Sequence, residues 1–207
     1  MSVKVDLKLD WCSHEAAKYA CVHWHYSKSI PAPPYNFVGV WENSKFIGVV
    51  IFSRGANNNL AKPYGLKIEE ACELTRIALT KHITPVSRIM AIAFKFLKKQ
   101  SPLLKLCVSY ADPNNGHHGG IYQATNWIYT GKTPKDYKYK DKKGRIWHRK
   151  QVSVSGLRKE FGEIRKVAKF SDCERIPLEG KHRYLMPLTE EMREKVLPLA
   201  KPYPKRV

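Results

Sequence analysis

Hydrophobic residues recur along the first part of the chain with two different periods, which predict helices and strands. Residues 13–24 carry one apolar stripe after Ser13, a residue type that caps helices, so a helix is predicted there. Phe37–Trp41 and Phe46–Phe52 are nearly continuous apolar runs. The polar Glu42-Asn43-Ser44 between them predicts a β-hairpin.

A polar surface loop is expected at Arg54–Gly65, and further apolar segments follow it. Ala71–Leu79 and Leu104–Tyr110 are predicted strands, and a helix is predicted to begin between them at Thr84-Pro85, with Pro85 in its first position. The apolar face of this helix comprises Val86, Ile89, Ala93, Phe96 and Leu97.

Further predicted elements extend to the end of the chain. They are a short helix at Ile121–Trp127, a strand beginning at Ile128–Gly131, a β-ribbon at 132–150 that turns at Asp141–Gly144, a basic helix at Leu157–Lys169, a strand at Arg183–Met186 and a helix after Thr189. The order predicts an α/β fold with a central mixed β-sheet flanked by helices. We expect a catalytic domain at 1–152 that includes the ribbon, and a basic C-terminal extension at 153–207 packed on the same domain.

The surplus of positive charge indicates which class of molecule the protein binds. The 37 Lys and Arg residues outnumber the 18 Asp and Glu residues and give a formal net charge of +19. Such a surplus favours a polyanion, because neutralised phosphates release condensed counterions. Nucleic acid is therefore the expected partner. A membrane surface is the weaker alternative, since no long basic amphipathic helix is evident.

Apolar runs and cysteines indicate the compartment. No stretch approaches eighteen consecutive apolar residues, so we expect no membrane association. The five cysteines are scattered and form no CxxC pair, which favours reduced thiols in a cytoplasm. The sequence leaves the oligomeric state open, with a homodimer as one option.

Two histidines stand near the end of the first predicted helix, in His23-Trp24-His25-Tyr26-Ser27-Lys28. On a continuing helix their side chains point about 200° apart, whereas in an extended turn they fall on one side. A role in catalysis or metal binding is one interpretation, and a packing or surface role is the other.

Glu73 and Arg76 interrupt an otherwise apolar predicted strand, where unpaired burial would be costly. A structural ion pair is one interpretation. Strict alternation places the two side chains on opposite faces, so both reach one cleft only if the strand carries a β-bulge, a feature common beside active sites.

Asp112 follows a buried predicted strand and precedes the glycine-rich segment 113–120, which contains His117 and His118. Open α/β sheets bind ligands at such strand ends. The alternative is a loop that uses Asp and Asn for turn geometry. His25 with Asp112, together with a further histidine, would suit non-haem iron, although no HExxH spacing is present. P-loop, GxGxxG and GxSxG motifs are also absent from the sequence.

The ribbon at 132–150 interleaves nine Lys and Arg residues with Tyr137, Tyr139 and Trp147. Cations for phosphates and aromatic faces for bases are typical of a nucleic-acid surface, and a solvated charged hairpin is the alternative. The residues that we expect to bind DNA are Lys138, Lys140, Lys142, Lys143, Arg145 and Arg149.

The succession of elements at 71–79, 85–99, 104–111 and 119–127 resembles the core of the GNAT acyltransferase fold. The segment Gly120–Trp127 is similar to the late helix of that family, which commonly carries a tyrosine near the thioester sulfur. In place of the family's glycine-rich pyrophosphate loop, this chain has Lys81–Arg88, whose backbone N–H groups at the helix start can still bind an anion.

A larger set of motifs resembles the Mom DNA-modification proteins of Mu-like phages. The residues that carry this resemblance are His23-Trp24-His25-Tyr26-Ser27, Phe46–Gly55, Glu73-Leu74-Thr75-Arg76, Tyr110-Ala111-Asp112-Pro113 and His117–Gln123. The resemblance implies conversion of adenine N6 in phage DNA to a carbamoylmethyl derivative, which protects the DNA from host restriction. It also implies the host cytoplasm, double-stranded DNA as partner, acetyl-CoA as cofactor and a bound iron.

The resemblance also implies roles for individual residues. His25, Tyr26 and Asp112 would lie in the catalytic cleft, with His25 and Asp112 as metal ligands. Glu73 and Arg76 would flank the cleft. Ser87 and Arg88 would bind the cofactor phosphates, and Tyr122 would approach the thioester.

Three other functions compete with adenine modification. An ordinary GNAT N-acetyltransferase acting on RNA, protein or a small amine would give an acetylated product. A metal-dependent nuclease using His25, Asp112 and His117 would cut DNA. A non-catalytic DNA-binding protein would bind with a steep salt dependence.

Overall fold

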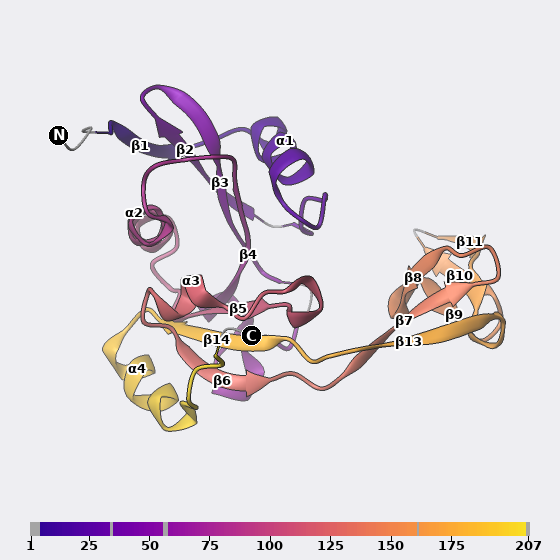
Figure 1. Ribbon diagram of the computed structural model, residues 1–207. Coiled ribbons are helices and arrows are strands. Elements are labelled where there is room, and N and C mark those ends of the chain that lie inside the picture. The colour runs from indigo at the N-terminus through magenta and orange to yellow at the C-terminus, as the bar shows by residue number, and fades with distance from the viewer. Residues whose placement is uncertain (1–4, 34, 56–57, 161, 206–207) are drawn as a thin grey trace. The chain divides into compact units, whose positions relative to one another are not determined.

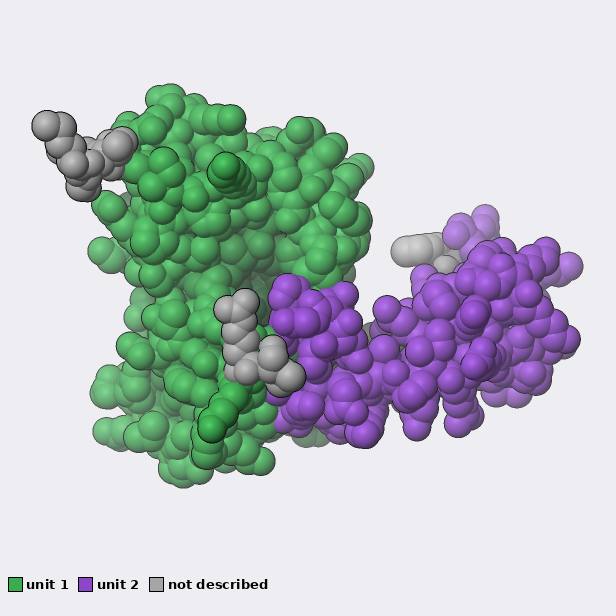
Figure 2. Space-filling view, viewed as in Figure 1, with its two compact units in different colours: residues 1–111, 118–131, 183–207 green, residues 112–117, 132–182 purple. Residues whose placement is uncertain are grey.

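The computed structural model describes residues 5–33, 35–55, 58–160 and 162–205. The chain divides into two compact units (Figure 2). Unit 1 comprises residues 1–111, 118–131 and 183–207, and unit 2 comprises residues 112–117 and 132–182. Within the described residues no helix is long and apolar enough to cross a membrane.

A seven-stranded sheet organises unit 1, in the order β1-β2-β3-β4-β5-β14-β6 (Figure 1). The strands are β1 (Leu7–Trp11), β2 (Tyr35–Glu42), β3 (Lys45–Ser53), β4 (Ala71–Leu79), β5 (Leu106–Ala111), β6 (Ile128–Lys132) and β14 (His182–Pro187). Strands β1 to β4 pair antiparallel, whereas β4 and β5 pair parallel. The sheet is therefore mixed, as the order of elements predicts.

Helices cover both faces of this sheet. They are α1 (His14–Trp24), α2 (Val86–Gln100), α3 (Gly120–Gln123) and α4 (Glu190–Val196). The Ser13 side chain caps α1 as predicted, accepting a hydrogen bond from the Ala16 backbone N–H at 3.1 Å. Helix α2 begins one residue later than predicted, since Pro85 stands in the cap position and no side chain caps it.

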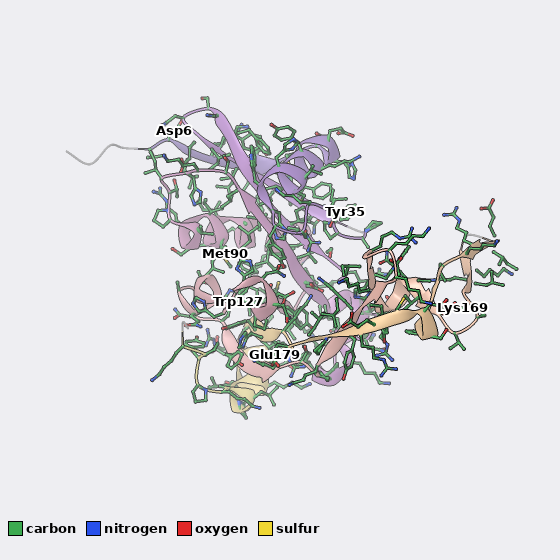
Figure 3. All side chains as sticks on the ribbon, turned by 45° about the vertical axis from the view of Figure 1, so that its right-hand side comes forward. Asp6, Tyr35, Met90, Trp127, Lys169 and Glu179 are labelled. Atoms are coloured by element: carbon green, nitrogen blue, oxygen red, sulfur yellow. The ribbon has the colours of Figure 1, made fainter. Side chains whose placement is uncertain are left out.

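The two long helices bury separate apolar clusters, because successive side chains of a strand point to opposite faces. Helix α1 packs its small residues Ala17, Ala20 and Cys21 against a cluster that includes Val49 and Ile51 of β3. Helix α2 packs on the opposite face, where the buried residues include Met90 and Trp127, both labelled in Figure 3. The α/β fold with a central mixed sheet flanked by helices is confirmed.

Unit 2 consists mainly of short strands. These are β7 (Asp136–Asp141), β8 (Ile146–His148), β9 (Val152–Ser153), β10 (Leu157–Glu160), β11 (Glu163–Lys166), β12 (Ala168–Lys169) and β13 (Cys173–Leu178). Strands β13, β7 and β8 form one sheet, and the predicted ribbon is its β7–β8 pair. Inside the unit, Tyr139 is 4% exposed and packs edge-on against Phe170, with ring centroids 4.9 Å apart.

Three predictions of secondary structure were wrong or incomplete. The expected basic helix at Leu157–Lys169 is instead the antiparallel hairpin β10–β11, because Gly162 adopts φ +88° and reverses the chain. The expected helix at Ile121–Trp127 forms only one turn. Strand β1 was not predicted, since its alternating segment is short and half polar.

The close approach of β3 and β4 generates a test of this packing. Gly48 adopts φ +145°, and a Cβ there would overlap the Ala78 carbonyl of β4. We expect Gly48→Ala to reduce the free energy of unfolding by at least about 2 kcal/mol, as measured by urea denaturation. Gly144→Ala is the control, since Gly144 also has a positive φ, +80°, but a Cβ there meets no described atom within 4 Å. Equal losses in both variants would contradict the steric explanation.

Candidate functional site

A β-bulge in β4 brings Glu73 and Arg76 to the same face of the sheet. Ile51 of β3 pairs with Arg76, but the next residue, Phe52, pairs with Leu74, so Thr75 is the extra residue. The Thr75 hydroxyl donates to the Ile51 carbonyl at 3.1 Å. Leu74 is buried in the apolar cluster on the α2 side of the sheet. Because of the bulge, both Glu73 and Arg76 face the α1 side. The β-bulge that Glu73 and Arg76 need in order to reach one cleft is therefore present.

Arg76 is held by main-chain carbonyl groups beside the end of α1. Its Nε donates to the Ser29 carbonyl at 3.2 Å, and its Nη1 donates to the Thr75 carbonyl at 2.7 Å. Burial raises the pKa of the Cys21 thiol on α1, and the Arg76 charge opposes that rise. The guanidinium thus links β4 to the segment that follows α1.

His25 lies where α1 ends. It is the C-terminal cap residue, with extended backbone angles (φ −104°, ψ 141°), and it is 8% exposed. The Ser27 hydroxyl lies 2.8 Å from Nδ1, and the Ser27 backbone N–H donates to the same nitrogen at 3.1 Å. These contacts fix the Nδ1 side of the ring within its own turn.

The neighbours of His25, Tyr26 and His23, lie in different environments. The Tyr26 ring lies with its centroid 4.3 Å from that of His25, and Tyr26 is 49% exposed. His23 remains on the helix, where it contacts the Tyr19 carbonyl through Nδ1 at 2.8 Å and stacks on the Tyr19 ring. The end of α1 therefore separates a surface histidine from the histidine of the candidate site.

Strands β4 and β5 pair over only three described residue pairs, the last of which is Glu73 with Val108. Directly beyond, a side chain joins the two strands, because the Ser109 hydroxyl donates to the Leu74 carbonyl at 2.7 Å. The Tyr122 hydroxyl oxygen, 2.8 Å from the same Ser109 hydroxyl, is the second acceptor within its reach. We call the point where the strands separate, with Glu73, Ser109 and Tyr122, the β4–β5 gap.

Tyrosine hydroxyls around the β4–β5 gap are held in their protonated form. Burial, the largest cause, raises the pKa of Tyr122 although the Ser109 hydrogen bond opposes it, and interactions with Tyr26 and Glu73 add to the rise. Burial and Glu73 likewise raise the pKa of Tyr110 to about 12. Tyr122 is therefore a hydrogen-bond donor at neutral pH and not a base.

A buried carboxylate occupies the start of α2, in the segment that we expected to bind cofactor phosphates. Glu42 is 7% exposed, and its carboxylate accepts hydrogen bonds from the backbone N–H groups of Ile83 (3.0 and 3.2 Å) and Thr84 (2.6 Å). Ser87 and Arg88 lie in the first turn of α2, half-buried and exposed respectively. The N–H groups at this helix start can bind an anion, as the sequence predicts, but those of Ile83 and Thr84 are occupied by the carboxylate of Glu42 from the same chain. The phosphate-binding role of Ser87 and Arg88 stays a prediction.

Asp112 and His117 belong to unit 2. Asp112 Oδ1 accepts hydrogen bonds from Asn114, from its backbone N–H at 3.0 Å and its side-chain amide at 2.8 Å. The Lys181 ammonium lies 3.9 Å from Oδ2. The carboxylate thus shapes its own turn, as the alternative interpretation of this loop proposed, and the structure adds no test of its catalytic role.

The donors present do not form an iron site. Within the described ranges, no group of three or more His, Cys, Asp or Glu side chains lies close enough together to hold a metal ion. The two predicted ligands, His25 and Asp112, belong to different compact units.

The predicted DNA-binding residues all lie in unit 2, where Trp147 and Arg145 bind the same carboxylate. Trp147 donates its indole N–H to Asp141 at 2.9 Å, and Arg145 donates to the same carboxylate at 2.8 Å. Burial alone would raise the pKa of Asp141, but these and backbone hydrogen bonds lower it to about 2. Lys138 and Lys140 are exposed on β7, Lys142 and Lys143 at the following turn, and Arg149 begins a 3-10 helix.

Three residues that hold this site escaped the sequence analysis: Ser27, Ser109 and Glu42. A serine within the apolar run Leu106–Ala111 was a usable signal, because a hydroxyl in a buried strand needs a partner. The hairpin position of Glu42 gave no such signal, since its partners lie 41 and 42 residues away along the chain.

Comparison with known proteins identifies relatives of the whole chain. The sequence model of the Mom protein family matches residues 6–205. A protein of Escherichia phage Mu, named Methylcarbamoylase mom, is 25% identical over 190 residues, which cover 87% of this chain and 76% of the phage protein.

Solved structures with a similar arrangement include acyltransferases of low sequence identity. An N-acyl amino acid synthase from uncultured soil microbes has a TM-score of 0.49 at 9% identity and covers 94% of this chain and 96% of its own. An IAA acetyltransferase from Bacillus cereus has a TM-score of 0.46 at 12% identity, with coverages of 88% and 100%.

The Glu42 carboxylate generates a pH-dependent prediction. Burial alone would raise its pKa, but hydrogen bonds from Thr84 and Ile83 lower it below the ordinary value. Its stabilisation is therefore present above the unfolded pKa of about 4.3 and is lost as the pH falls through the lower folded pKa. We expect Glu42→Gln to reduce the free energy of unfolding by about 1 to 2 kcal/mol at neutral pH, and by much less below about pH 4.

Urea denaturation at several pH values measures this effect. The matched control is Glu163→Gln, which removes a carboxylate that is 74% exposed. A pH-independent loss in Glu42→Gln, or an equal loss in the control, would refute the role of the Glu42 charge at the start of α2.

Proposed function

Because this chain belongs to the Mom protein family, we propose that it is a DNA-modifying transferase that places a carbamoylmethyl group on N6 of adenine. The observation that carries the proposal is the match of the family over residues 6–205, which includes every residue of the β4–β5 gap. The name of the phage Mu relative, a methylcarbamoylase, supports the transfer of a two-carbon amide group of this composition.

The partner that we propose is double-stranded DNA in the host cytoplasm. The formal charge of +19 favours a polyphosphate, and unit 2 holds the six predicted DNA-binding residues. Chemistry on a base of a duplex requires that the base leave the stack and enter the active site.

The proposed step forms a bond between N6 of adenine and the methylene carbon of the incoming group. The donor is therefore an acetamide that carries a leaving group on its methylene carbon: N6 loses a proton to a base, and that group departs with the bonding electrons. N6 is a poor nucleophile while its lone pair is delocalised into the ring, so removal of the proton must accompany bond formation. His25 and Asp112 are the candidates for this base.

Residues around the β4–β5 gap would orient and polarise the reactants. Tyr122 keeps its proton at neutral pH and can donate a hydrogen bond to developing negative charge on the donor. Arg76 is fixed by two carbonyl groups and presents a permanent positive charge on the α1 side of the sheet. Glu73, on the same strand, would contact the base or the donor.

Acetyl-CoA is the cofactor that the family resemblance implies, but it is not the donor in this displacement, because its acetyl group carries neither a leaving group on the methyl carbon nor an amide nitrogen. Its phosphates cannot use the N–H groups of Ile83 and Thr84 while Glu42 holds them. The proposed phosphate contacts are therefore limited to Ser87 and Arg88 in the first turn of α2.

Nucleoside mass spectrometry of plasmid DNA from expressing cells tests the reaction. We expect a deoxyadenosine heavier by a carbamoylmethyl group, and a decrease of at least about tenfold in its amount with Tyr122→Phe, because one transition-state hydrogen bond is lost. Fold stability should change little, since Ser109 keeps its bond to the Leu74 carbonyl. The control is Tyr19→Phe, in which the altered tyrosine is 51% exposed on α1.

Two further variants distinguish the candidate bases. Asp112→Asn keeps an oxygen for Asn114 but removes the charge, and His25→Gln removes the imidazole. Modification that survives both would exclude the two as bases. Acetylated adenine would contradict carbamoylmethyl transfer and indicate ordinary acyl transfer, and unmodified adenine from soluble protein would refute the proposed function.

A further inference from the structure

Unit 2 contains an open groove with a volume of about 580 Å³. Three segments line it: the turn after β7, the residues that lead into β10, and the run from the end of β11 through β12. Only the first of these segments belongs to the ribbon that the sequence predicted. We call this feature the Lys166–Lys169 groove, after the two lysines that lie outside the ribbon.

The Lys166–Lys169 groove has a surplus of positive charge. Its cations are Lys142, Lys143, Arg145, Lys166 and Lys169. Of its two carboxylates, Asp141 is already bound by Arg145 and Trp147, and Asp172 accepts a hydrogen bond from the Ser171 hydroxyl at 3.2 Å. In the described part of the chain, none of the four lysines has a carboxylate within ion-pair distance.

Main-chain bonds hold the floor of the groove in place. The Val167 N–H donates to the Gly156 carbonyl at 2.9 Å, and Ala168 pairs with Val152 in a parallel register. The stem of Lys169 lies across Gly156, where a Cβ would approach Lys169 Cγ to 2.8 Å. Leu157, 47% exposed, adds an apolar surface beside the lysines. The cations are thus carried by hydrogen-bonded main chain, and the side chain of Leu157 adds an apolar surface to the groove.

Charge across the unit agrees with this local surplus. Residues 132–182 carry sixteen Lys and Arg against seven Asp and Glu, although they make up about a quarter of the chain. Several of the acids are engaged, since Glu179 pairs with Lys132 and Lys135, and Glu163 pairs with Arg165. Cations without acidic partners are the expected composition of a surface that meets a phosphate backbone.

We propose that the Lys166–Lys169 groove binds the sugar-phosphate backbone of duplex DNA, as a contact surface additional to the outer face of the ribbon that carries Lys138 and Lys140. The inference rests on the proposed function for the identity of the nucleic acid. The groove is open and bordered by several cations, which suits a continuous strand of phosphates. The apolar surface of Leu157 suits the deoxyribose between phosphates.

The test measures binding of the full chain to a labelled duplex oligonucleotide by fluorescence anisotropy at several salt concentrations. The variant is Lys166→Gln with Lys169→Gln, and the control is Lys98→Gln with Lys99→Gln, which removes two exposed lysines from the end of α2 in unit 1. We expect the groove variant to lose at least about tenfold in affinity near 0.1 M salt. The slope of log K against log salt should become shallower by about 2, because two phosphate contacts are removed.

Each outcome decides the proposal. A loss confined to the groove variant, with an unchanged thermal melting curve, supports it. Equal losses in groove variant and control would assign the effect to net charge and overturn it, as would an unchanged salt slope in the groove variant. An RNA competitor that displaces the duplex at equal concentration would overturn the assignment to DNA. Nucleoside mass spectrometry of the same proteins keeps the two proposals apart, since binding can depend on the groove even if adenine is not modified.

Discussion

The extra residue in β4 is the constraint on which the candidate site depends. Without Thr75 as a bulge, Glu73 and Arg76 would point to opposite faces, and one charge would enter the apolar cluster beneath α2. The bulge keeps Leu74 in that cluster while both charges face α1. It lies directly after the point at which β4 and β5 separate, so the two charged residues and the Ser109–Tyr122 pair lie at the same short stretch of strand.

Carboxylates whose roles the structure reveals serve mainly to satisfy the backbone. Glu42 accepts the N–H groups before α2, Asp112 accepts those of its own turn, and Asp141 organises the β7–β8 turn. Each makes several hydrogen bonds within its own unit. The hydrogen bonds favour the ionised form of Glu42 and Asp141, since they lower the pKa of both carboxyl groups.

The sequence predicted the sheet and its two long helices because apolar periodicity, a serine cap and turn residues are local signals. It failed at Leu157–Lys169, where charged residues suit an exposed hairpin as well as a helix and only Gly162 marks the turn. For the site, it identified His25, Glu73, Arg76 and Tyr122 as candidate functional residues. It missed Ser109 and Glu42, because their roles arise from pairing between segments that are distant along the chain.

The larger segment of unit 2, residues 132–182, is inserted between two strands that are neighbours in the seven-stranded sheet. The chain leaves at the end of β6 and returns into β14, and the Thr133 N–H donates to the Lys181 carbonyl at 2.8 Å, so the insertion begins and ends at nearly one point. A short turn could close the same hairpin. The inserted residues can therefore be lengthened, trimmed or replaced without altering the register of the sheet in unit 1, which leaves the two units free to change independently.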